Sequence, residues 1–394
     1  MNGEPTPLEQ ARQLMRQGRI SEAEPLFARV LAADSGNVEA LNTLGLAAIR
    51  QGNLPGALDL LSRAVRLAPE IHTARLYLAM THDRLGNRQA ATLHYARALN
   101  DAQAQGRWLD AETTPPVLRP LLERAVIAVR SGTRAAMAEL FEPLEKRHGR
   151  AALARVEKCL RIYLREEPAV RPDERQQPSF LFFPDLPPSA YLERSRFSWI
   201  EALEADTDKI RAELLRLLPN SAGRERVFDS EEIERQNLRG LDVAPSWNGY
   251  YFYRHGARRE DNCSSCPDTA RALDRLPLAH VREHGPEVLY SVFTPGTHLL
   301  PHRGVTNTRL VGHLPLIIPE NCALKVGGEV HSWEPGKVVV FDDTYEHEAW
   351  NRSQQTRVVM IFDVWHPDLS DAEREAVALL VGAIGDFRKA MEAG

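Results

Sequence analysis

The sequence predicts a chain in two parts, a helical solenoid of repeats followed by a β-rich jelly roll with flanking helices, so the fold class is multidomain α + β. Two observations predict this. Glycine, alanine and large apolar residues recur at a fixed spacing through the first hundred positions. From Ser291 to Pro367, short apolar runs rich in Val and Ile are interrupted by Pro and Gly. The first pattern is typical of stacked helical pairs, and the second of short strands in a sandwich or closed jelly roll.

The composition is that of an ordinary soluble globular protein, with 43% hydrophobic and 26% charged residues among 394. A net charge of -5 argues against a nucleic-acid partner. No apolar run is long enough for a membrane span and no signal-peptide pattern is present, so we expect no membrane span and a cytoplasmic location. Four cysteines do not make a disulfide framework. Cys263 and Cys266 offer two of the four ligands that zinc needs, and we interpret them as two thiols in a loop.

The repeats have a period of 34 residues, which separates Gly18, Gly52 and Gly86. A glycine allows a tight turn, a small alanine lets two helices approach, and a large apolar residue fills the remaining space. This is the tetratricopeptide period, and we predict tetratricopeptide repeats over residues 5–104. Their concave face is expected either to bind a peptide or protein, or only to support or dimerise the second part. The same period relates Ala23, Ala57 and Ala91, then Phe27, Leu61 and Tyr95, then Leu31, Val65 and Leu99.

Residues 105–178 are predicted to form a helical extension and a linker. Apolar residues at three- and four-residue spacing predict helices over 117–130, 133–147 and 151–164, with Gly132 separating the first two. The charged, proline-containing segment 166–177 is interpreted as the linker.

Residues 179–394 are predicted to form the jelly roll with a closing helix. His302 and His347 lie at strand edges, which a jelly roll can bring together at its mouth, where neutral imidazoles can bind a metal. The predicted elements are a helix over 200–218, strands over 247–253, 287–294, 314–318, 324–330, 337–341 and 358–364, and a helix over 370–391.

Several phrases in this part carry a resemblance to a known family. They are Pro295-Gly296-Thr297-His298, Pro301-His302-Arg303-Gly304, Phe341-Asp342-Asp343 with Glu346-His347-Glu348, and Asp363-Val364-Trp365-His366-Pro367. Residues 247–367 resemble the aspartyl/asparaginyl β-hydroxylase family of Fe(II)- and 2-oxoglutarate-dependent oxygenases. The resemblance implies a double-stranded β-helix, with Fe(II), 2-oxoglutarate and O2 as cofactor and co-substrates. It also implies peptidyl-aspartic acid hydroxylation, at the β-carbon of Asp or Asn, although family members also act on lipids.

The metal site departs from the commonest iron pattern. Such sites hold the metal by two histidines and a carboxylate, usually beginning with His-x-Asp or His-x-Glu. Here the sequence is His302-Arg303-Gly304, and glycine offers no ligand. The resemblance implies this glycine as well, with the metal held by His302 and His347 alone. One of the four acids around His347 could replace the missing ligand or hydrogen-bond a histidine. None of Asp342, Asp343, Glu346 and Glu348 is assigned to the metal.

The co-substrate 2-oxoglutarate is a dianion whose far carboxylate needs a cationic anchor, and the planar fork of arginine suits it. The resemblance assigns this anchor to Arg357, with Ser291 beside it, and further contacts to Trp247 and His313. The family has an arginine where this chain has Val311, whereas Arg309 matches a separate family arginine. The pocket has therefore lost one positive contact, or Arg309 supplies it.

Two classes of function follow from these residues. The first is a dioxygenase in which His302, His347 and Arg357 are catalytic and the repeats help to recruit a peptide or protein substrate. The second is a non-catalytic tetratricopeptide adaptor with a degenerate jelly roll, which Val311 favours. An oxygenase acting on a free amino acid or a lipid stays open beside the first. No Walker loop, dinucleotide fingerprint or Ser/His/Asp motif supports a hydrolase or nucleotide-binding protein.

Overall fold

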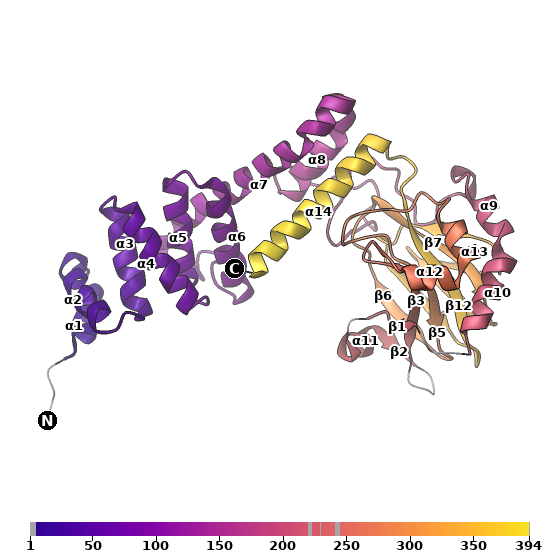
Figure 1. The fold of residues 1–394 in the computed structure, drawn as a ribbon, viewed down its shortest axis with the longest axis horizontal. Coiled ribbons are helices and arrows are strands. Elements are labelled where there is room, and N and C mark those ends of the chain that lie inside the picture. The colour runs from indigo at the N-terminus through magenta and orange to yellow at the C-terminus, as the bar shows by residue number, and fades with distance from the viewer. Residues whose placement is uncertain (1–4, 220–222, 229, 241–244, 394) are drawn as a thin grey trace. The chain divides into compact units, whose positions relative to one another are not determined.

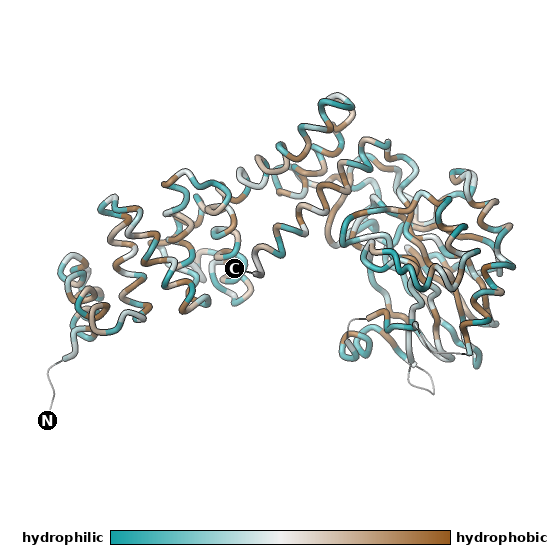
Figure 2. The backbone as a smooth tube through the Cα atoms, viewed as in Figure 1, coloured by the Kyte–Doolittle hydropathy of each residue, from teal (hydrophilic) through white to brown (hydrophobic). Residues whose placement is uncertain are grey.

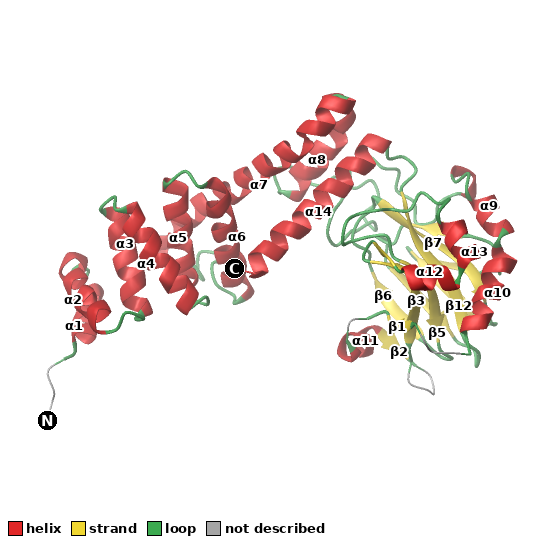
Figure 3. Ribbon diagram, viewed as in Figure 1, coloured by secondary structure: helices red, strands yellow, loops and turns green. Residues whose placement is uncertain are grey.

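The computed structural model describes residues 5–219, 223–228, 230–240 and 245–393 (Figure 1). Its contacts divide the chain into two compact units, Met1–Leu140 with Ile384–Gly394, and Phe141–Ala383. The described strands all lie in the second unit (Figure 3). The domain boundaries that the sequence suggests, at residues 105 and 179, stay predictions.

The predicted repeats are confirmed as three helical pairs. Gly18, Gly52 and Gly86 end the first helix of each pair with φ of 75°, 79° and 79°. This left-handed region suits glycine, which explains why glycine recurs there. The helices are α1 (Pro7–Arg16), α2 (Ile20–Ala33), α3 (Val38–Arg50), α4 (Leu54–Leu67), α5 (His72–Arg84) and α6 (Arg88–Ala104).

Small and large residues alternate through the core of the repeats as the period predicts. Ala23 and Ala57 are fully buried, and so is Leu61. Gly45 of α3 shows why a small residue is needed, since a Cβ there would lie 2.6 Å from Cγ of Leu61 in α4. Figure 2 shows hydrophobic residues recurring along each of these helices.

The region after the repeats corrects one prediction. A single helix, α7 (Arg119–His148), follows the 3-10 turn η1 (Pro116–Leu118), where two helices separated by Gly132 were predicted. Gly132 does not end the helix, because its role is close packing. A Cβ at this position would lie 2.0 Å from Oγ1 of Thr92 in α6. The next predicted helix is present as η2 (Arg150–Leu153) and α8 (Ala154–Tyr163).

Two antiparallel sheets confirm the predicted jelly roll. The seven-stranded sheet has the order β1-β3-β5-β12-β7-β10, with β4 paired to β3, and the five-stranded sheet has the order β2-β6-β11-β8-β9. The strands are β1 (Arg224–Arg226), β2 (Leu238–Arg239), β3 (Trp247–Arg254), β4 (Ala257–Arg258), β5 (Val288–Phe293), β6 (His298–His302), β7 (Arg309–Ile317), β8 (Cys322–Val326), β9 (Glu329–His331), β10 (Val339–Phe341), β11 (His347–Asn351) and β12 (Arg357–Trp365).

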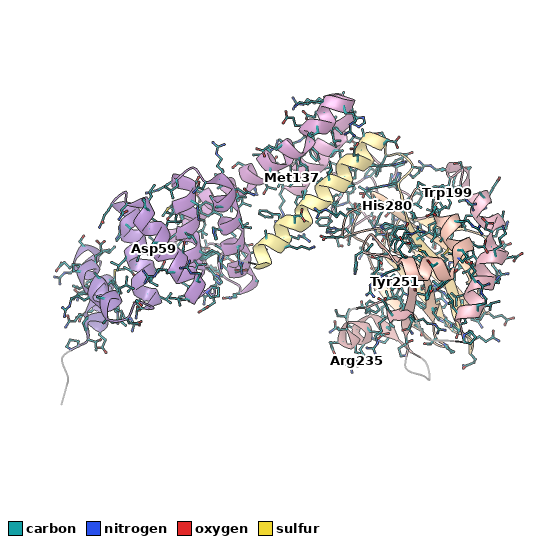
Figure 4. The ribbon with its side chains drawn as sticks, in the orientation of Figure 1. Asp59, Met137, Trp199, Arg235, Tyr251 and His280 are labelled. Atoms are coloured by element: carbon teal, nitrogen blue, oxygen red, sulfur yellow. The ribbon has the colours of Figure 1, made fainter. Side chains whose placement is uncertain are left out.

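Two hydrophobic clusters stabilise this unit. One joins the seven-stranded sheet to helices on its outer face, and the other fills the space between the two sheets. Trp199, which precedes the first of these helices, packs edge-to-face on Phe362 of β12, while Tyr251 of β3 is buried (Figure 4). The outer helices are α9 (Ile200–Ala205), α10 (Thr207–Leu217), α12 (Glu260–Ser265) and α13 (Pro267–Leu273), and two further helices are α11 (Glu231–Asn237) and α14 (Asp371–Ala393).

Three local predictions are wrong. The helix predicted over 200–218 is interrupted at Asp206, whose carboxylate accepts hydrogen bonds from Lys209 and Arg275. The strand predicted over 324–330 turns at Gly327 and Gly328, which have φ of 57° and 93°, and becomes β8 and β9. Cys263 and Cys266 do not lie in a loop. They are free, buried thiols on α12 and immediately before α13.

The segment interpreted as a linker binds the jelly roll. Gln176 is 2% exposed, and its Nε2 donates to Oδ2 of Asp342 at 2.6 Å. The backbone N–H of Gln177 donates to the carbonyl of Thr344 at 3.0 Å, and the hydroxyl of Tyr345 donates to Asp173 at 3.1 Å. These bonds fix the turn that leads into His347. None of the described helices combines the length and the apolar character that crossing a membrane requires.

Candidate active site

The two predicted metal ligands meet across neighbouring strands. His302 ends β6, His347 begins β11, and the antiparallel register places them directly opposite each other. Their ring centroids lie 4.0 Å apart. Residues directly opposite in an antiparallel pair have neighbouring side chains, so the sheet alone brings these distant positions together.

Both imidazoles are held in the state that a metal needs. Nδ1 of His302 lies 2.8 Å from the carbonyl oxygen of Leu300, and Nδ1 of His347 lies 3.1 Å from that of Tyr345. Because a carbonyl only accepts, each Nδ1 carries the hydrogen and each Nε2 keeps its lone pair. Burial lowers the pKa of His302, and burial followed by the nearby His302 lowers the pKa of His347 to about 3. Both rings are therefore neutral near pH 7.

Asp343 occupies the space that a side chain at position 304 would need. A Cβ on Gly304 would lie 2.1 Å from Cγ and 2.1 Å from Oδ1 of Asp343. The backbone N–H of Gly304 also donates to the Asp343 carbonyl at 2.6 Å. Oδ1 of Asp343 is buried without a hydrogen-bond partner, and burial raises the pKa of this carboxyl while Arg309 opposes the rise. Glycine at position 304 is therefore what allows a carboxylate from another loop to lie beside His302.

The other three acids around His347 have different roles. Asp342 accepts from the backbone N–H and the hydroxyl of Thr344 and closes the turn. Glu346 pairs with Arg303 at 3.2 Å and is largely exposed. Glu348 binds His298 and Lys325. Among the described residues, no three or more His, Cys, Asp or Glu side chains are arranged so that they could hold a metal ion together. The histidine pair, with Asp343 and its unpartnered oxygen beside it, still fits a divalent transition metal.

Arg357, at the start of β12, is a buried cation for which no described residue supplies an anion. It is 1% exposed, and its guanidinium lies 4.3 Å from the ring centroid of Phe293 and 4.4 Å from that of Trp333. Nη1 donates to Oγ of Ser291 at 3.2 Å, whereas Nε has no partner and no described carboxylate pairs with the side chain. Burial lowers the pKa of Arg357 to about 9. A buried, unpaired charge is costly, and a carboxylate ligand would compensate it.

The groups around Arg357 also fit a carboxylate. Ser291 accepts from Nη1 of Arg357 and, at 2.9 Å, from Nε1 of Trp247, so its own hydroxyl hydrogen is left to donate. Nδ1 of His313 and Nε1 of Trp333 are buried without partners. Burial, and then the nearby Arg357, hold the pKa of His313 well below its usual range, so its ring is neutral.

One aromatic ring connects the histidine pair to this anion pocket. The ring of Phe341 lies 5.6 Å from that of His347 and 5.0 Å from that of His313, measured between centroids. A continuous series of contacts therefore links the predicted site residues, and their roles stay predictions; they are His302, His347, His313, Arg357, Ser291 and Trp247.

Arg309, unlike Arg357, is paired with carboxylates. Its Nη1 lies 2.6 Å from Oδ1 of Asp363, and its Nη2 lies 3.3 Å from Oδ2 of Asp343. Although burial alone lowers the pKa of Arg309, these two carboxylates raise it above its usual range. Val311 is buried in the apolar cluster between the sheets. Of the two alternatives left by the sequence, the geometry favours the loss of one positive contact.

Sequence reasoning missed Trp333 and Phe293 and left Asp343 unassigned. Phe293 was visible only as one more apolar residue in a predicted strand. Trp333 lies in the connection between β9 and β10, where no periodicity marks it. Asp343 was recognised as a neighbour of His347, but its approach to Gly304 depends on a contact between two loops.

Two parts of the chain are similar to known protein families. Residues 204–367 match the family model described as aspartyl/asparaginyl beta-hydroxylase, and residues 8–70 and 45–107 match the tetratricopeptide repeat model. The human protein named aspartyl/asparaginyl beta-hydroxylase is 36% identical over 179 residues, 45% of this chain and 22% of that protein. The Rhizobium tropici ornithine lipid ester-linked acyl 2-hydroxylase is 34% identical over 191 residues, 48% of this chain and 64% of that protein.

A third relative is aspartate beta-hydroxylase domain-containing protein 2 of Xenopus tropicalis, 30% identical over 238 residues, 59% of this chain and 61% of that protein. The chain thus spans less than two thirds of each of these relatives. A Pseudomonas putida prolyl-4-hydroxylase structure aligns over 42% of this chain and 98% of that one, with a TM-score of 0.24 and 14% identity. Residues 204–367 are thus similar to aspartyl/asparaginyl β-hydroxylases, and residues 8–107 are similar to tetratricopeptide repeats.

Proposed function

We propose that the chain is an Fe(II)- and 2-oxoglutarate-dependent dioxygenase that hydroxylates the β-carbon of Asp or Asn in a peptide or protein. The observation that carries the proposal is the unpaired, buried guanidinium of Arg357 next to a pair of neutral histidines. A buried cation favours binding of an anion, and two neutral imidazoles favour binding of a metal.

His302 and His347 would hold Fe(II) through Nε2, with Asp343 beside them as a ligand or a hydrogen-bond partner of bound water. The iron would supply oxygen activation, coupling decarboxylation of 2-oxoglutarate to succinate with hydroxylation of the substrate. Arg357 and the Ser291 hydroxyl would bind the far carboxylate. The carbonyls of Leu300 and Tyr345 hold the two rings in one tautomer and orientation.

The aromatic residues of the pocket have a second role. Phe293, Trp333 and Phe341 are each buried to 95% or more, and they surround the proposed 2-oxoglutarate carboxylate with apolar surface. Low access to water strengthens the charge-assisted bonds of Arg357. Only the fraction of the protein with Arg357 protonated would bind the dianion well.

The repeats would recruit the polypeptide substrate, as stacked helical repeats commonly do. A cytoplasmic location is part of the proposal, and the four free, buried cysteines are consistent with it. Cell fractionation would test it.

The test is an anaerobic titration of the Fe(II)-loaded protein with 2-oxoglutarate, followed by an oxygen pulse and a succinate assay. We expect a metal-to-ligand charge-transfer band and succinate from the wild type, and neither from His302→Ala or His347→Ala. Arg352→Ala is the matched control. Arg352 is exposed and lies 4.7 Å over the ring of Trp350, so it resembles Arg357 without facing the pocket. Folded wild-type protein without a band at millimolar 2-oxoglutarate would contradict the proposal and favour the adaptor.

A lipid acyl chain is a second candidate substrate. The name of the Rhizobium tropici relative describes such an activity for that protein. In this chain, Val311 adds apolar surface where the family pattern has a charge. Hydroxylated acyl chains after incubation with the wild type, in the absence of peptide hydroxylation, would decide for the lipid.

A further inference from the structure

A second pocket lies outside the candidate active site, within the unit Phe141–Ala383. It has a volume of about 580 Å³ and is formed where α8 ends and the chain turns back along residues 178–182. This size is typical of pockets that bind ligands. Its lining includes Tyr163, Arg165, Pro168, Arg171, Phe180 and Phe182.

The pocket offers more positive than negative charge to a ligand. Arg165 and Arg171 are both exposed, and neither has a carboxylate partner among the described residues. Arg171 is held 5.2 Å over the ring of Phe182, which fixes its guanidinium at the wall. Glu167 forms an ion pair with Arg161 at 2.9 Å, and Glu166 is the other acid of the lining. An anionic ligand is therefore favoured.

The rest of the lining suits an apolar side chain. Tyr163 and Phe180 pack edge-to-face with their centroids 5.8 Å apart, and Pro168 and Pro178 add rigid apolar surface. Aromatic residues and arginines are enriched in the surfaces by which proteins bind other polypeptides. One apolar side chain can enter the aromatic part while acidic neighbours reach the arginines.

The wall of this pocket is bonded to the loop that follows His302. The backbone N–H of Ser179 donates to the carbonyl of Gly304 at 3.0 Å, and those of Phe180 and Leu181 donate to the carbonyl of Val305 at 3.0 and 2.9 Å. A polypeptide bound here would lie close to the loop at the proposed metal site, so its neighbouring residues could reach the histidine pair.

We propose that this pocket binds a segment of the polypeptide substrate in which acidic side chains flank an apolar one, and that it holds this segment while a nearby residue enters the active site. The proposal rests on the proposed function, because it names the class of substrate and where that substrate docks. The proposed contact between the substrate and this pocket lies outside the catalytic residues, so peptide binding can be measured without turnover.

The probe is a fluorescein-labelled 15-residue peptide with Asp and Glu around a central Phe-Leu pair, and its binding to the metal-free 394-residue chain is measured by fluorescence anisotropy. Two control peptides replace either every acid by its amide or the Phe-Leu pair by Ser-Ser. Arg165→Gly is a favourable variant, because Arg165 follows α8 with φ of 57° and glycine relaxes this conformation. Arg171→Gln and Arg171→Glu change the other charge. Arg165→Lys and Arg29→Gln, an exposed site on α2, are the matched controls.

We expect each neutralising variant to raise the Kd of the acidic peptide about threefold and Arg171→Glu about tenfold, as exposed charge pairs do. The control variants should leave the Kd unchanged, and both control peptides should bind more weakly. Equal binding of the amide peptide, or a Kd within twofold of wild type in all three variants, would overturn the proposal. So would full competition by phenylacetate at the peptide's own Kd, because the pocket would then take small carboxylates.

Succinate formation separates this proposal from the proposed function. Arg165→Gly and Arg171→Gln should keep the wild-type rate of succinate formation without peptide, since neither residue touches the catalytic groups. If the protein makes no succinate but the variants weaken peptide binding, the oxygenase proposal is contradicted and the docking proposal is supported. Succinate formation with peptide binding that ignores the variants would remove the docking site alone.

Discussion

The two arginines of the candidate site have opposite surroundings although they lie on adjacent strands of one sheet. Arg309 on β7 is bound by the carboxylates of Asp363 and Asp343. Arg357 on β12 has two aromatic faces and a serine hydroxyl but no described carboxylate partner. A paired cation stabilises the fold around it, whereas an unpaired one favours a ligand. The missing partner, more than the arginine itself, therefore marks the candidate anion site.

The largest expected effect is on stability, in Arg309→Met. Removing this guanidinium leaves Asp343 and Asp363, whose side chains are 8% and 4% exposed, without their counter-charge. We expect the free energy of unfolding, measured by urea denaturation, to fall by about 3 kcal/mol. Adding Asp363→Asn should recover part of this loss. A loss below about 1 kcal/mol would show that the two carboxylates do not depend on Arg309.

Arg357→Ala should affect ligand binding instead of folding. Charge-assisted hydrogen bonds contribute about 1.5–3 kcal/mol, so the Kd of 2-oxoglutarate should rise by roughly 10- to 150-fold. The unfolding free energy should not fall as it does in Arg309→Met, because an unpaired buried charge is removed. Titration of the charge-transfer band and urea denaturation measure both quantities, with Arg352→Ala as the control. Equal losses of unfolding free energy in the two arginine variants would contradict the contrast between a paired Arg309 and an unpaired Arg357.

Gly304→Ala tests the fit of Asp343 on the other side of the site. The added Cβ would lie 2.1 Å from the Asp343 carboxylate, and such overpacking costs about 1–3 kcal/mol of unfolding free energy. Gly304→Ala with Asp343→Ala removes the collision and should be more stable than Gly304→Ala alone. Additive losses in the double variant would mean that the two side chains do not compete for this space.

Sequence reasoning succeeded where the determining contacts are local or repeated. The glycine turns at 18, 52 and 86 follow from a period, and the strands from short apolar runs bounded by turns. His302 and His347 were candidates as histidines at strand edges, the family resemblance implied them as ligands, and the sheet register explains why they lie together.

It failed where the meaning of a residue depends on a distant partner. Gly132 continues a helix because of Thr92, and Gly304 accommodates Asp343. Arg309 and His313 share one face of β7 by alternation, yet the partners of Arg309 come from β12 and from the turn before β11. No pattern within a strand predicts which of its polar residues remains unpaired.

Trp333 tests whether the aromatic faces help to hold the cation of Arg357. A desolvated cation–π contact contributes about 2 kcal/mol, so Trp333→Leu should raise the Kd of 2-oxoglutarate roughly tenfold or more. Trp333→Phe keeps an aromatic face but removes the unpartnered Nε1–H, and a smaller increase is expected. Equal effects of the two substitutions would assign the role of Trp333 to the N–H group, and no effect of either would remove it from the pocket.

The smallest expected effect is the change in the Kd of 2-oxoglutarate between pH 7 and pH 9. Burial lowers the pKa of Arg357 to about 9 in the free protein, and a bound carboxylate favours the charged guanidinium and raises this pKa. Protons are therefore taken up on binding above this pH. The Kd of 2-oxoglutarate should be constant from pH 7 to 8, increase about twofold at pH 9, and increase further towards tenfold per pH unit above it. Calorimetric titration of the Mn(II)-loaded protein measures this. The same dependence of the Kd on pH in Arg357→Ala would assign the titration to another group. A Kd that does not change with pH in the wild type would mean that Arg357 stays charged without its ligand. The two aromatic rings beside Arg357 would then be enough to hold the cation.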